Sequence, residues 1–272
     1  MIIAVASGKG GTGKTLIATS LARSINEKLT FLDCDVEEPN SAIFLKPEIK
    51  EEEEAVKLVP SVDYEKCNFC AKCEEVCAYN AIVVVKDRVM IFPELCHSCG
   101  ACSYLCPAIN EVKRRIGAIR RGKRKKIEFY EGVLDVGEPM ATPLIKEVKK
   151  KRKGLTIIDC PPGTACPAME SVRGSDYILM VTEATPFGLS DLEIAVDAFR
   201  ELGAEMGVIV NKSLGSEEIE EFCEKKGIEV LMHIPLDREI AKGYSEGRTL
   251  VGQYAEELKA LYRRISEADS RD

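Results

Sequence analysis

Eight of the twelve cysteines in this 272-residue chain occur in two runs that share one spacing. Each run reads Cys-x2-Cys-x2-Cys-x3-Cys, and the runs comprise Cys67, Cys70, Cys73, Cys77, Cys96, Cys99, Cys102 and Cys106. The first three thiolates of a run can bind three corners of one iron–sulfur cube, which leaves the fourth for another cluster. The spacing therefore predicts that this part of the chain binds iron–sulfur clusters.

The two runs resemble those of bacterial-type ferredoxins that carry two [4Fe–4S] clusters. The resemblance implies crossed ligand sets, which are Cys67, Cys70, Cys73 and Cys106 for the first cluster and Cys96, Cys99, Cys102 and Cys77 for the second. Pro107 follows the second run as in that pattern, whereas Ala78 follows the first. Zinc and disulfides are the alternatives, but zinc usually takes two separated pairs of cysteines and disulfides are rare in a reducing compartment.

A second group of residues, Gly8 to Thr15, is suited to binding phosphate. Its glycines let backbone N–H groups close around phosphate oxygens, and the helix expected from Lys14 adds its positive N-terminal end. We expect Lys14 to pair with the β- and γ-phosphates and the Thr15 hydroxyl to bind Mg²⁺. The other residues expected around the phosphates are Gly10, Gly11, Thr12 and Gly13.

Lys9 distinguishes this loop from a general phosphate loop, which is indifferent at that position. The run Lys-Gly-Gly-x-Gly-Lys-Thr that begins at Lys9 resembles the deviant loop of the MinD/Mrp/ParA group of P-loop ATPases. In that group the early lysine reaches across a nucleotide-sandwich dimer to the partner's phosphates. The resemblance therefore implies an ATP-dependent homodimer, and a solvated loop lysine is the alternative.

The resemblance extends to three carboxylates that follow apolar strands, Asp33, Asp35 and Asp159. It implies that Asp33 and Asp159 join Thr15 around Mg²⁺ and that Asp35 orients the attacking water. The residues that would carry hydrolysis, by positioning and charge neutralisation, are Lys9, Lys14 and Asp35. A carboxylate at the end of an apolar strand is costly unless it meets a cation or hydrogen bonds. A helix cap is the alternative for Asp33 or Asp35 taken singly.

Two further positions match the places where the MinD/Mrp/ParA group contacts adenine. Asn211 ends a predicted strand, and Pro235 lies in a loop that resembles the group's second adenine-flanking loop. The residue two positions after Lys212 is not Asp, so the guanine-reading Asn-Lys-x-Asp motif is absent from the sequence. ATP is therefore the expected nucleotide.

These residues must be held by a mostly parallel sheet. Nearly continuous apolar runs alternate with helical patterns, which is typical of a sheet covered on both faces. The expected strands are 2–6, 30–35, 155–159, 176–182, 207–211 and 228–234, and the expected helices are 14–26, 143–151, 189–202, 216–226 and 250–267. The predicted fold class is α/β, a P-loop (Rossmann-like) sheet with helices on both faces and an inserted small α+β bacterial-ferredoxin domain.

The predicted domain map is an ATPase domain of residues 1–59 and 112–272 around a ferredoxin-like insert of residues 60–111. Within the insert, strands 82–85 and 89–92 separate the cysteine runs, which repeat at an offset of 29 residues. Residues 113–136 are expected to form a basic hairpin with its turn at residues 120–123. Residues 51–54, all glutamate, are expected to be a surface loop.

Charge and hydropathy limit the partners of the chain. Its net charge of −7 argues against nucleic acid, and no apolar stretch approaches the roughly 20 residues of a membrane span. Nine positive charges nevertheless fall within residues 113–126, either as a solvated hairpin tip or as a docking site for an acidic redox partner. The last helix is expected to pack on the sheet rather than on a membrane. Without an export signal, we expect a cytoplasmic protein.

Four cysteines lie outside the two runs. We expect Cys34, Cys160 and Cys223 to be small buried hydrophobic residues. Cys166 falls in the segment that resembles the second switch of the MinD/Mrp/ParA group. A structural role is expected for it, with a redox or transient cluster-ligand role as the alternative.

The two groups of motifs together imply an ATP-binding iron–sulfur protein with slow, partner-stimulated hydrolysis. The first hypothesis is a nucleotide-switched accessory factor in iron–sulfur or metallocofactor assembly that delivers electrons or clusters to a client protein. The alternative is an ATP-gated electron donor to a reductase, comparable to the iron protein of nitrogenase. A third is a ParA/MinD-type positioning ATPase.

Overall fold

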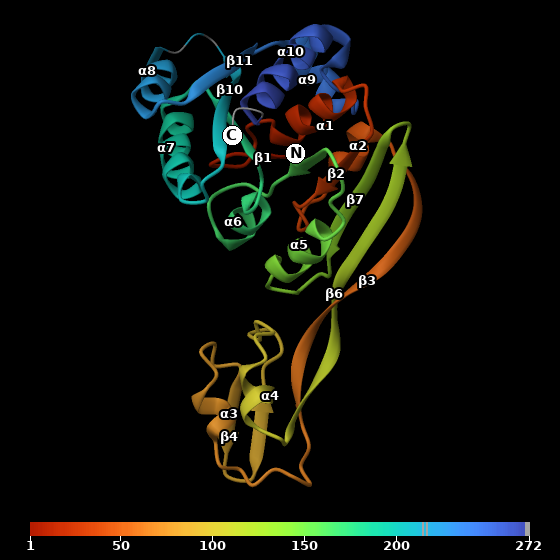
Figure 1. The fold of residues 1–272 in the computed structure, drawn as a ribbon, viewed down its shortest axis with the longest axis vertical. Coiled ribbons are helices and arrows are strands. Elements are labelled where there is room, and N and C mark those ends of the chain that lie inside the picture. Colours follow the sequence, from red (N-terminus) through yellow and green to blue (C-terminus); the bar gives the residue numbers. More distant parts are fainter. Residues whose placement is uncertain (214, 216, 270–272) are drawn as a thin grey trace.

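The computed structural model describes residues 1–213, 215 and 217–269, and its main body is a nine-stranded sheet (Figure 1). Across the sheet the strands are β11 (Glu229–Pro235), β10 (Glu205–Ser213), β9 (Tyr177–Glu183), β1 (Ile2–Ala6), β8 (Thr156–Asp159), β2 (Leu29–Asp33), β7 (Ile127–Leu134), β6 (Ile109–Arg124) and β3 (Glu48–Val62). The seven strands from β11 to β7 are parallel, and β6 and β3 complete one edge in antiparallel pairing. The predicted α/β fold with a mostly parallel sheet is confirmed.

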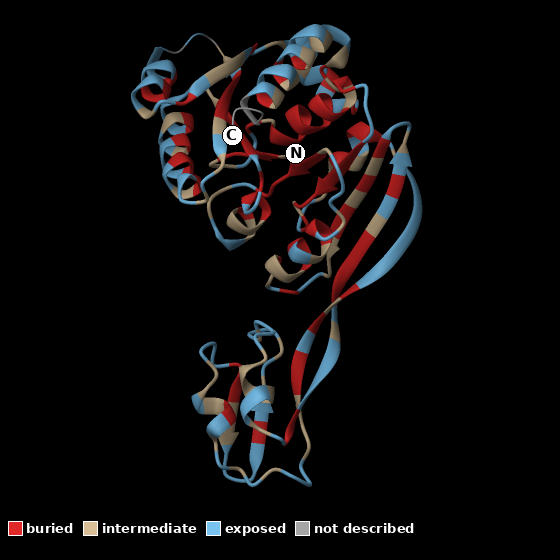
Figure 2. Ribbon diagram, viewed as in Figure 1, coloured by how far each residue is buried: buried red, intermediate tan, exposed pale blue. Residues whose placement is uncertain are grey.

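Helices cover both faces of this sheet. One face packs against α5 (Thr142–Lys149), α6 (Cys166–Val172), α7 (Pro186–Arg200) and α8 (Glu217–Lys226). The other packs against α1 (Lys14–Ser24), α2 (Ser41–Leu45), α9 (Arg238–Ser245) and α10 (Val251–Asp269). The inner strands are apolar on both faces, so they are buried throughout (Figure 2). The parallel order brings the carboxyl ends of β1, β2 and β8 to one edge, where the phosphate loop begins.

The edge strands β3 and β6 pair over their whole length and continue past the sheet as a two-stranded ribbon (Figure 1). We call this ribbon the stalk. It leads to residues 63–108, which contain α3 (Lys72–Glu75), the hairpin β4 (Ile82–Val85) and β5 (Arg88–Ile91), and α4 (Ala101–Leu105). This cysteine-rich segment has a small core of its own around Cys73, Ile82, Val89 and Ile109. The strands of the stalk cross the predicted boundaries at 59/60 and 111/112 without a break.

Two predictions for this edge of the sheet are wrong. The hairpin turn lies at Lys125 and Lys126, because β6 runs on to Arg124 and Lys125 takes the positive φ of 51° that the turn needs. The expected loop at residues 51–54 is part of β3. Glu51 and Glu52 lie opposite Arg121 and Arg120 of β6, and the cross-strand ion pairs permit a strand where charge alone predicts a loop.

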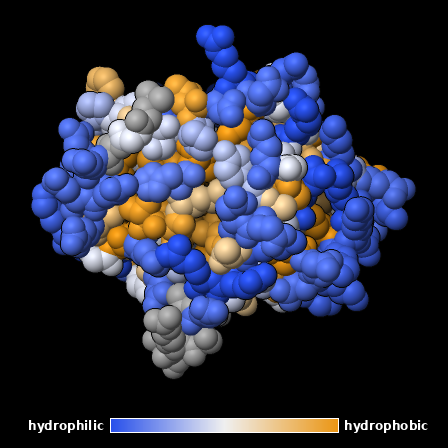
Figure 3. Space-filling model, turned by 90° about the horizontal axis from the view of Figure 1, so that it is seen from above, coloured by the Kyte–Doolittle hydropathy of each residue, from blue (hydrophilic) through white to orange (hydrophobic). Residues whose placement is uncertain are grey.

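The same ion pairs bear on the basic run of residues 113–126. Arg115 pairs with Glu54, Arg120 with Glu52, and Arg121 with Glu51, so much of the positive charge is neutralised within the sheet edge. Seen from above, hydrophilic side chains cover most of the surface around smaller hydrophobic patches (Figure 3). None of the helices in the described ranges is both long enough and apolar enough to cross a bilayer.

Candidate functional site

The phosphate loop joins β1 to α1, as the sequence predicts, and two of its glycines are required by close contacts. Gly13 has a φ of +88°, and a Cβ there would lie 2.3 Å from the Asn211 amide nitrogen. A Cβ on Gly8 would lie 2.1 Å from the carbonyl oxygen of Asp191. Side chains help to hold the loop: Ser7 Oγ donates to the Lys9 carbonyl (2.8 Å), and Asn211 Nδ2 donates to the Thr12 carbonyl (2.7 Å).

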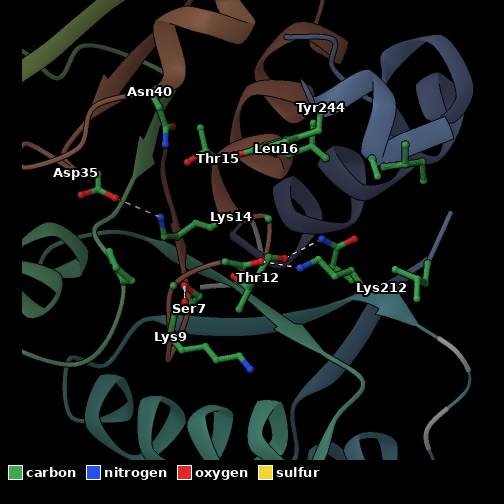
Figure 4. Close-up of a pocket in the computed structure, with 18 of the residues that line it drawn as sticks. Ser7, Lys9, Thr12, Lys14, Thr15, Leu16, Asp35, Asn40, Lys212 and Tyr244 are labelled. Carbon is green, nitrogen blue, oxygen red and sulfur yellow. Dashed lines mark hydrogen bonds and ion pairs between the residues drawn. The ribbon is translucent and has the colours of Figure 1, made fainter. Parts of the chain in front are cut away.

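A cavity of about 470 Å³ opens above this loop (Figure 4). The predicted residues that line it are Lys9, Gly10, Gly11, Thr12, Gly13, Lys14, Thr15, Asp35, Asn211 and Pro235. Its volume is in the range of small-ligand sites. Leu236, Ile240 and Tyr244 add an apolar wall that the sequence analysis missed. The spacing of four residues between Leu236, Ile240 and Tyr244 is the helical signal that could have revealed α9 and this wall.

Two polar atoms in the wall of the cavity have no hydrogen-bond partner. They are the Thr12 hydroxyl, on a side chain only 2% exposed, and the Asn40 side-chain oxygen. A buried polar group without a partner costs about 1–3 kcal/mol. The cavity is therefore suited to a polar ligand that supplies the missing hydrogen bonds.

The buried amine of Lys14 lies among the three predicted carboxylates. Its Nζ is 3.5 Å from Asp159 Oδ1. Asp35 Oδ2 lies 4.0 Å from the same amine (Figure 4). Asp33 and Asp159 are opposite each other on β2 and β8, and both are fully buried behind the cavity wall. Ser41, which the sequence analysis did not identify, joins them: its N–H donates to Asp33 Oδ2 and its hydroxyl to Asp159 Oδ2, each over 3.0 Å.

Crowding of carboxylates changes the proton affinity of this cluster. Burial and the charge of Asp159 raise the pKa of Asp35 to about 6, although Lys14 acts in the opposite direction. Burial and Asp159 also raise the pKa of Asp33. Burial by itself would lower the pKa of Lys14, but Asp159 and Asp35 outweigh it and the pKa is raised. The site thus holds more negative charge than one lysine neutralises, which favours an added cation.

No three His, Cys, Asp or Glu side chains in the described part of the chain are grouped closely enough to bind a metal ion by themselves. Magnesium is commonly held by one or two carboxylates together with waters and substrate phosphates. The arrangement of Thr15, Asp33 and Asp159 is compatible with that mode, in which the nucleotide completes the coordination.

Lys9 points away from Lys14 (Figure 4). Its Nζ lies 3.3 Å from Glu183 Oε2, and the same carboxylate contacts Lys212, whose Nζ also donates to the Gly11 carbonyl. These two lysines lower the pKa of Glu183 against the effect of its burial. Lys9 is therefore held at the rim of the cavity by an ion pair within its own chain.

The two cysteine runs lie within the same small segment, and the crossed ligand sets that the resemblance implies stay a prediction. Cys67, Cys102 and Cys106 pack against the small core that contains Cys73, and Cys70 is exposed. Burial and the neighbouring Cys106 and Cys67 raise the pKa of the Cys73 thiol.

The second set surrounds one small cavity, which is lined by Cys77 of the first run and Cys96, Cys99 and Cys102 of the second. Burial raises the pKa of Cys102, and Cys96 and Cys99 add to the effect. In the part of the chain that the structure describes, these thiols do not form a group that could hold a single metal ion.

The backbone of the two cysteine loops repeats as well. Phe69 and Ala71 in the first loop, and Ser98 and Gly100 in the second, all have positive φ between 54° and 74°. Such φ values are costly for residues other than glycine and are concentrated at functional sites. Left-handed residues also form the backbone nests that hold phosphate and iron–sulfur groups. Backbone N–H groups already approach two sulfurs, Ala81 to Cys77 (3.2 Å) and Ser98 to Cys96 (3.4 Å).

The remaining cysteines match their expected placement. Cys34, Cys160 and Cys223 are buried, and burial raises the pKa of each thiol. Cys166 is exposed at the start of α6. It lines a groove of about 1010 Å³ between α5, α6 and the second cysteine loop, to which His97 and Ser98 contribute.

Comparison with known proteins places this fold and this loop in a family. The family described as the CobQ/CobB/MinD/ParA nucleotide binding domain matches residues 3–251. An uncharacterized protein of Methanocaldococcus jannaschii is 32% identical over 98% of this chain and 97% of its own. An iron-sulfur cluster carrier protein of Aquifex aeolicus is 23% identical over 92% of this chain and 61% of its own.

A solved structure shares the fold over nearly the whole chain. The septum site-determining protein MinD of Pyrococcus horikoshii, complexed with Mg-ADP, has a TM-score of 0.57 at 20% identity, over 99% of this chain and 96% of its own. The match of the family to most of the chain, together with the relative at 32% identity, settles the assignment. The chain belongs to the CobQ/CobB/MinD/ParA nucleotide-binding family.

Proposed function

We propose that this protein binds and slowly hydrolyses ATP, and that the nucleotide controls an iron–sulfur module carried in the same chain. The observation that carries the proposal is that Cys77 of the first run lines one cavity with Cys96, Cys99 and Cys102 of the second, in a chain that also has the family's phosphate loop. The Mg-ADP bound to the MinD of similar fold supports Mg²⁺ and an adenine nucleotide as the ligands. Bound clusters would supply one-electron transfer.

In this proposal each residue of the cavity has a role. Lys14 neutralises the β- and γ-phosphates, and backbone N–H groups of residues 10–15 surround them. Thr15, Asp33 and Asp159 hold Mg²⁺, and Asp35 at the cavity wall orients the attacking water. Asn211 and Pro235 flank the base. These residues act only by positioning and charge neutralisation. Hydrolysis is therefore slow until a partner stimulates it.

A structural connection links the nucleotide site to the cysteine-rich segment. Ser41, which hydrogen-bonds Asp33 and Asp159, is the first residue of α2, and α2 is followed by β3 and the stalk. The far end of the stalk is bonded to the second cysteine loop, since Ser98 Oγ donates to the Leu58 carbonyl over 2.6 Å. A cation or γ-phosphate that moves the carboxylates would thus act on an element continuous with the stalk.

A buried ion-pair network supports the same connection. Lys57 of the stalk pairs with Glu138, before α5, over 2.8 Å. Arg114 Nη1 lies 3.0 Å from Glu138, although not in line for a hydrogen bond, and Arg114 also contacts Glu94, two residues before Cys96. These contacts fix the second cysteine loop relative to the main body.

The function that fits best is an accessory factor in iron–sulfur or metallocofactor assembly that delivers electrons or clusters to a client protein. The resemblance to a protein named as an iron-sulfur cluster carrier supports this choice. An ATP-gated electron donor to a reductase is the second candidate, favoured by the self-contained core around the cysteines. A positioning role in the ParA/MinD manner has no use for the cysteine runs.

The test of nucleotide control is the variant Lys9→Ala, with Lys28→Ala as the matched control on an exposed loop. Size-exclusion chromatography with light scattering should give a dimer of the wild-type protein with Mg²⁺ and a non-hydrolysable ATP analogue. We expect Lys9→Ala to stay monomeric with unchanged visible cluster absorption. Dimers formed equally by Lys9→Ala would remove the inference drawn from this lysine.

A second experiment separates the two leading functions. Anaerobic protein is mixed with an apo-ferredoxin or with a redox acceptor, in the presence of Mg-ATP. Movement of iron and sulfide to the apo-protein supports assembly, whereas chelator-resistant clusters that cycle between redox states support electron donation.

A further inference from the structure

We propose that a cavity at the far end of α1, distinct from the nucleotide site, binds a small phosphate-bearing anion. The cavity has a volume of about 450 Å³ and is formed by the last turn of α1, the end of α2, the tip of the β6–β7 hairpin and the segment before α10. Each of these segments contributes one cation, and the four are Arg23, Lys46, Arg124 and Arg248. The argument for this anion site does not require that the proposed function is correct.

The charge around the cavity is one-sided. Within the described chain, no Asp or Glu lines it, and one of its cations, Arg248, pairs with Glu246 over 2.8 Å. The chain as a whole carries a net charge of −7, so a cavity lined by four cations is opposite in sign to the net charge of the protein. Burial and the neighbouring Arg124 lower the pKa of Arg23. Two guanidinium groups held close together repel each other unless an anion lies between them.

The hydrogen bonds of these arginines leave room for such an anion. Arg23 donates to the Thr249 hydroxyl over 3.0 Å, and Arg124 donates to the carbonyl oxygen of Leu45. Both acceptors are neutral, and each guanidinium has five N–H donors in all. The planar fork of arginine matches the oxygens of phosphate, which can accept two parallel hydrogen bonds. Phosphate is therefore the chemistry that this set of donors fits best.

The shape of the cavity favours a compact ligand. Its four cations come from separate segments and converge on one space, whereas a nucleic-acid backbone is followed by cations arranged along a groove. The volume is within the range of small-molecule sites. Gly252 adds open space at the wall, because a Cβ built on it would contact nothing within 4 Å. A soluble phosphate or pyrophosphate group fits these limits.

A ligand here would be coupled to the nucleotide site through two helices. Lys14 begins α1 and Arg23 lies in its last turn, about 14 Å away at 1.5 Å per residue. Ser41, which contacts Asp33 and Asp159, begins α2, and Lys46 caps its other end. An anion that draws Arg23, Lys46 and Arg124 together would hold both helices and the end of β6 at the hairpin tip. By linkage, the anion and the nucleotide must then change each other's affinity by the same factor.

The test is isothermal titration with inorganic pyrophosphate, without Mg²⁺, in a Lys14→Gln background that weakens phosphate binding at the nucleotide site. We expect pyrophosphate to bind this protein, and the added pair Arg23→Gln and Arg124→Gln to weaken binding at least about tenfold. Lys46→Gln, at an exposed position, should weaken it by a smaller factor without affecting folding. Arg263→Gln, on the exposed side of α10, is the matched control and should leave binding unchanged.

Several results would overturn the proposal. Pyrophosphate that binds the wild-type protein but not Lys14→Gln would be bound at the phosphate loop alone. A loss in Arg263→Gln as large as in the double variant would show a general charge effect. Binding to phosphatidylglycerol vesicles without any binding of pyrophosphate would assign the cavity to a membrane lipid. None of these outcomes depends on whether the protein hydrolyses ATP.

Discussion

Asp35 is the residue of the nucleotide site whose protonation changes near neutral pH. Its carboxyl lies 4.0 Å from the Lys14 amine, yet burial and Asp159 raise its pKa from 3.8 to about 6. The folded protein therefore holds this proton more tightly than the unfolded chain does. The stabilisation is present in full below the pKa of the unfolded chain and is lost as the pH rises to about 6.

This difference predicts a pH-dependent stability of the nucleotide-free protein. Between pH 4 and pH 6.5 the free energy of unfolding should fall by about 2 kcal/mol through Asp35, and Asp35→Asn should remove that part of the slope. Urea unfolding at a series of pH values, without Mg²⁺ and nucleotide, measures it. Equal slopes for wild type and variant would mean that the folded protein does not raise the pKa of Asp35.

Ser41 provides a prediction that the sequence motifs do not. Its hydroxyl bonds Asp159 and its N–H bonds Asp33, so Ser41→Ala leaves a buried carboxylate with one donor fewer. We expect a loss of stability of about 1–3 kcal/mol and weaker binding of Mg-ATP, measured by chemical unfolding and by a fluorescent ATP analogue. Ser190→Ala, at an exposed position of α7, is the control. Mg-ATP affinity unchanged in Ser41→Ala would separate this hydroxyl from the metal site.

At the residue scale, motif spacing predicted most of the polar residues that line the cavity but not the contacts that support them. Glycine and lysine positions in the phosphate loop follow from local sequence, because the loop is one continuous segment. Ser41 and Tyr244 reach the site only through the sheet order and the docking of α9, neither of which a local pattern specifies. The ion pair between Lys9 and Glu183 also joins residues far apart in the chain.

Among the secondary-structure elements, the strands of the stalk, like α9, were not revealed by sequence patterns. The strands inside the parallel sheet are apolar runs and were predicted, whereas β3 carries four consecutive glutamates and β6 a run of basic residues. Charged residues are depleted in strands, so each run by itself indicates a loop. Only the pairing of one run with the other, through contacts such as Arg120 with Glu52, makes the two strands stable together.

The buried end of the stalk yields a prediction with an internal control. Glu138 contacts two cations, Lys57 and Arg114. Among the described residues, Lys57 forms its ion pair with Glu138 alone. Glu138→Gln leaves a buried lysine unpaired and should cost about 3 kcal/mol or more, while Lys57→Met leaves Glu138 paired with Arg114 and should cost clearly less. Chemical unfolding measures both. The reverse order of the two losses would contradict the network.

At the scale of the whole molecule, the two groups of motifs are joined rather than merely adjacent. The stalk strands continue directly from the sheet, and the second cysteine loop is bonded to the stalk and shares a groove with the start of α6. The sequence could predict an insert but not this arrangement, because the offset of the cysteine runs says nothing about how the segment is attached. We therefore expect nucleotide binding and cluster reactivity to depend on each other.

The most direct test of this interdependence is the rate at which a chelator removes iron from anaerobically prepared protein. The crossed cysteine sets predict about eight irons per chain. Iron loss is then compared between Mg-ADP and a non-hydrolysable Mg-ATP analogue, and we expect the rates to differ by about fivefold or more. About eight irons with identical rates in both nucleotide states would contradict the coupling of the two sites.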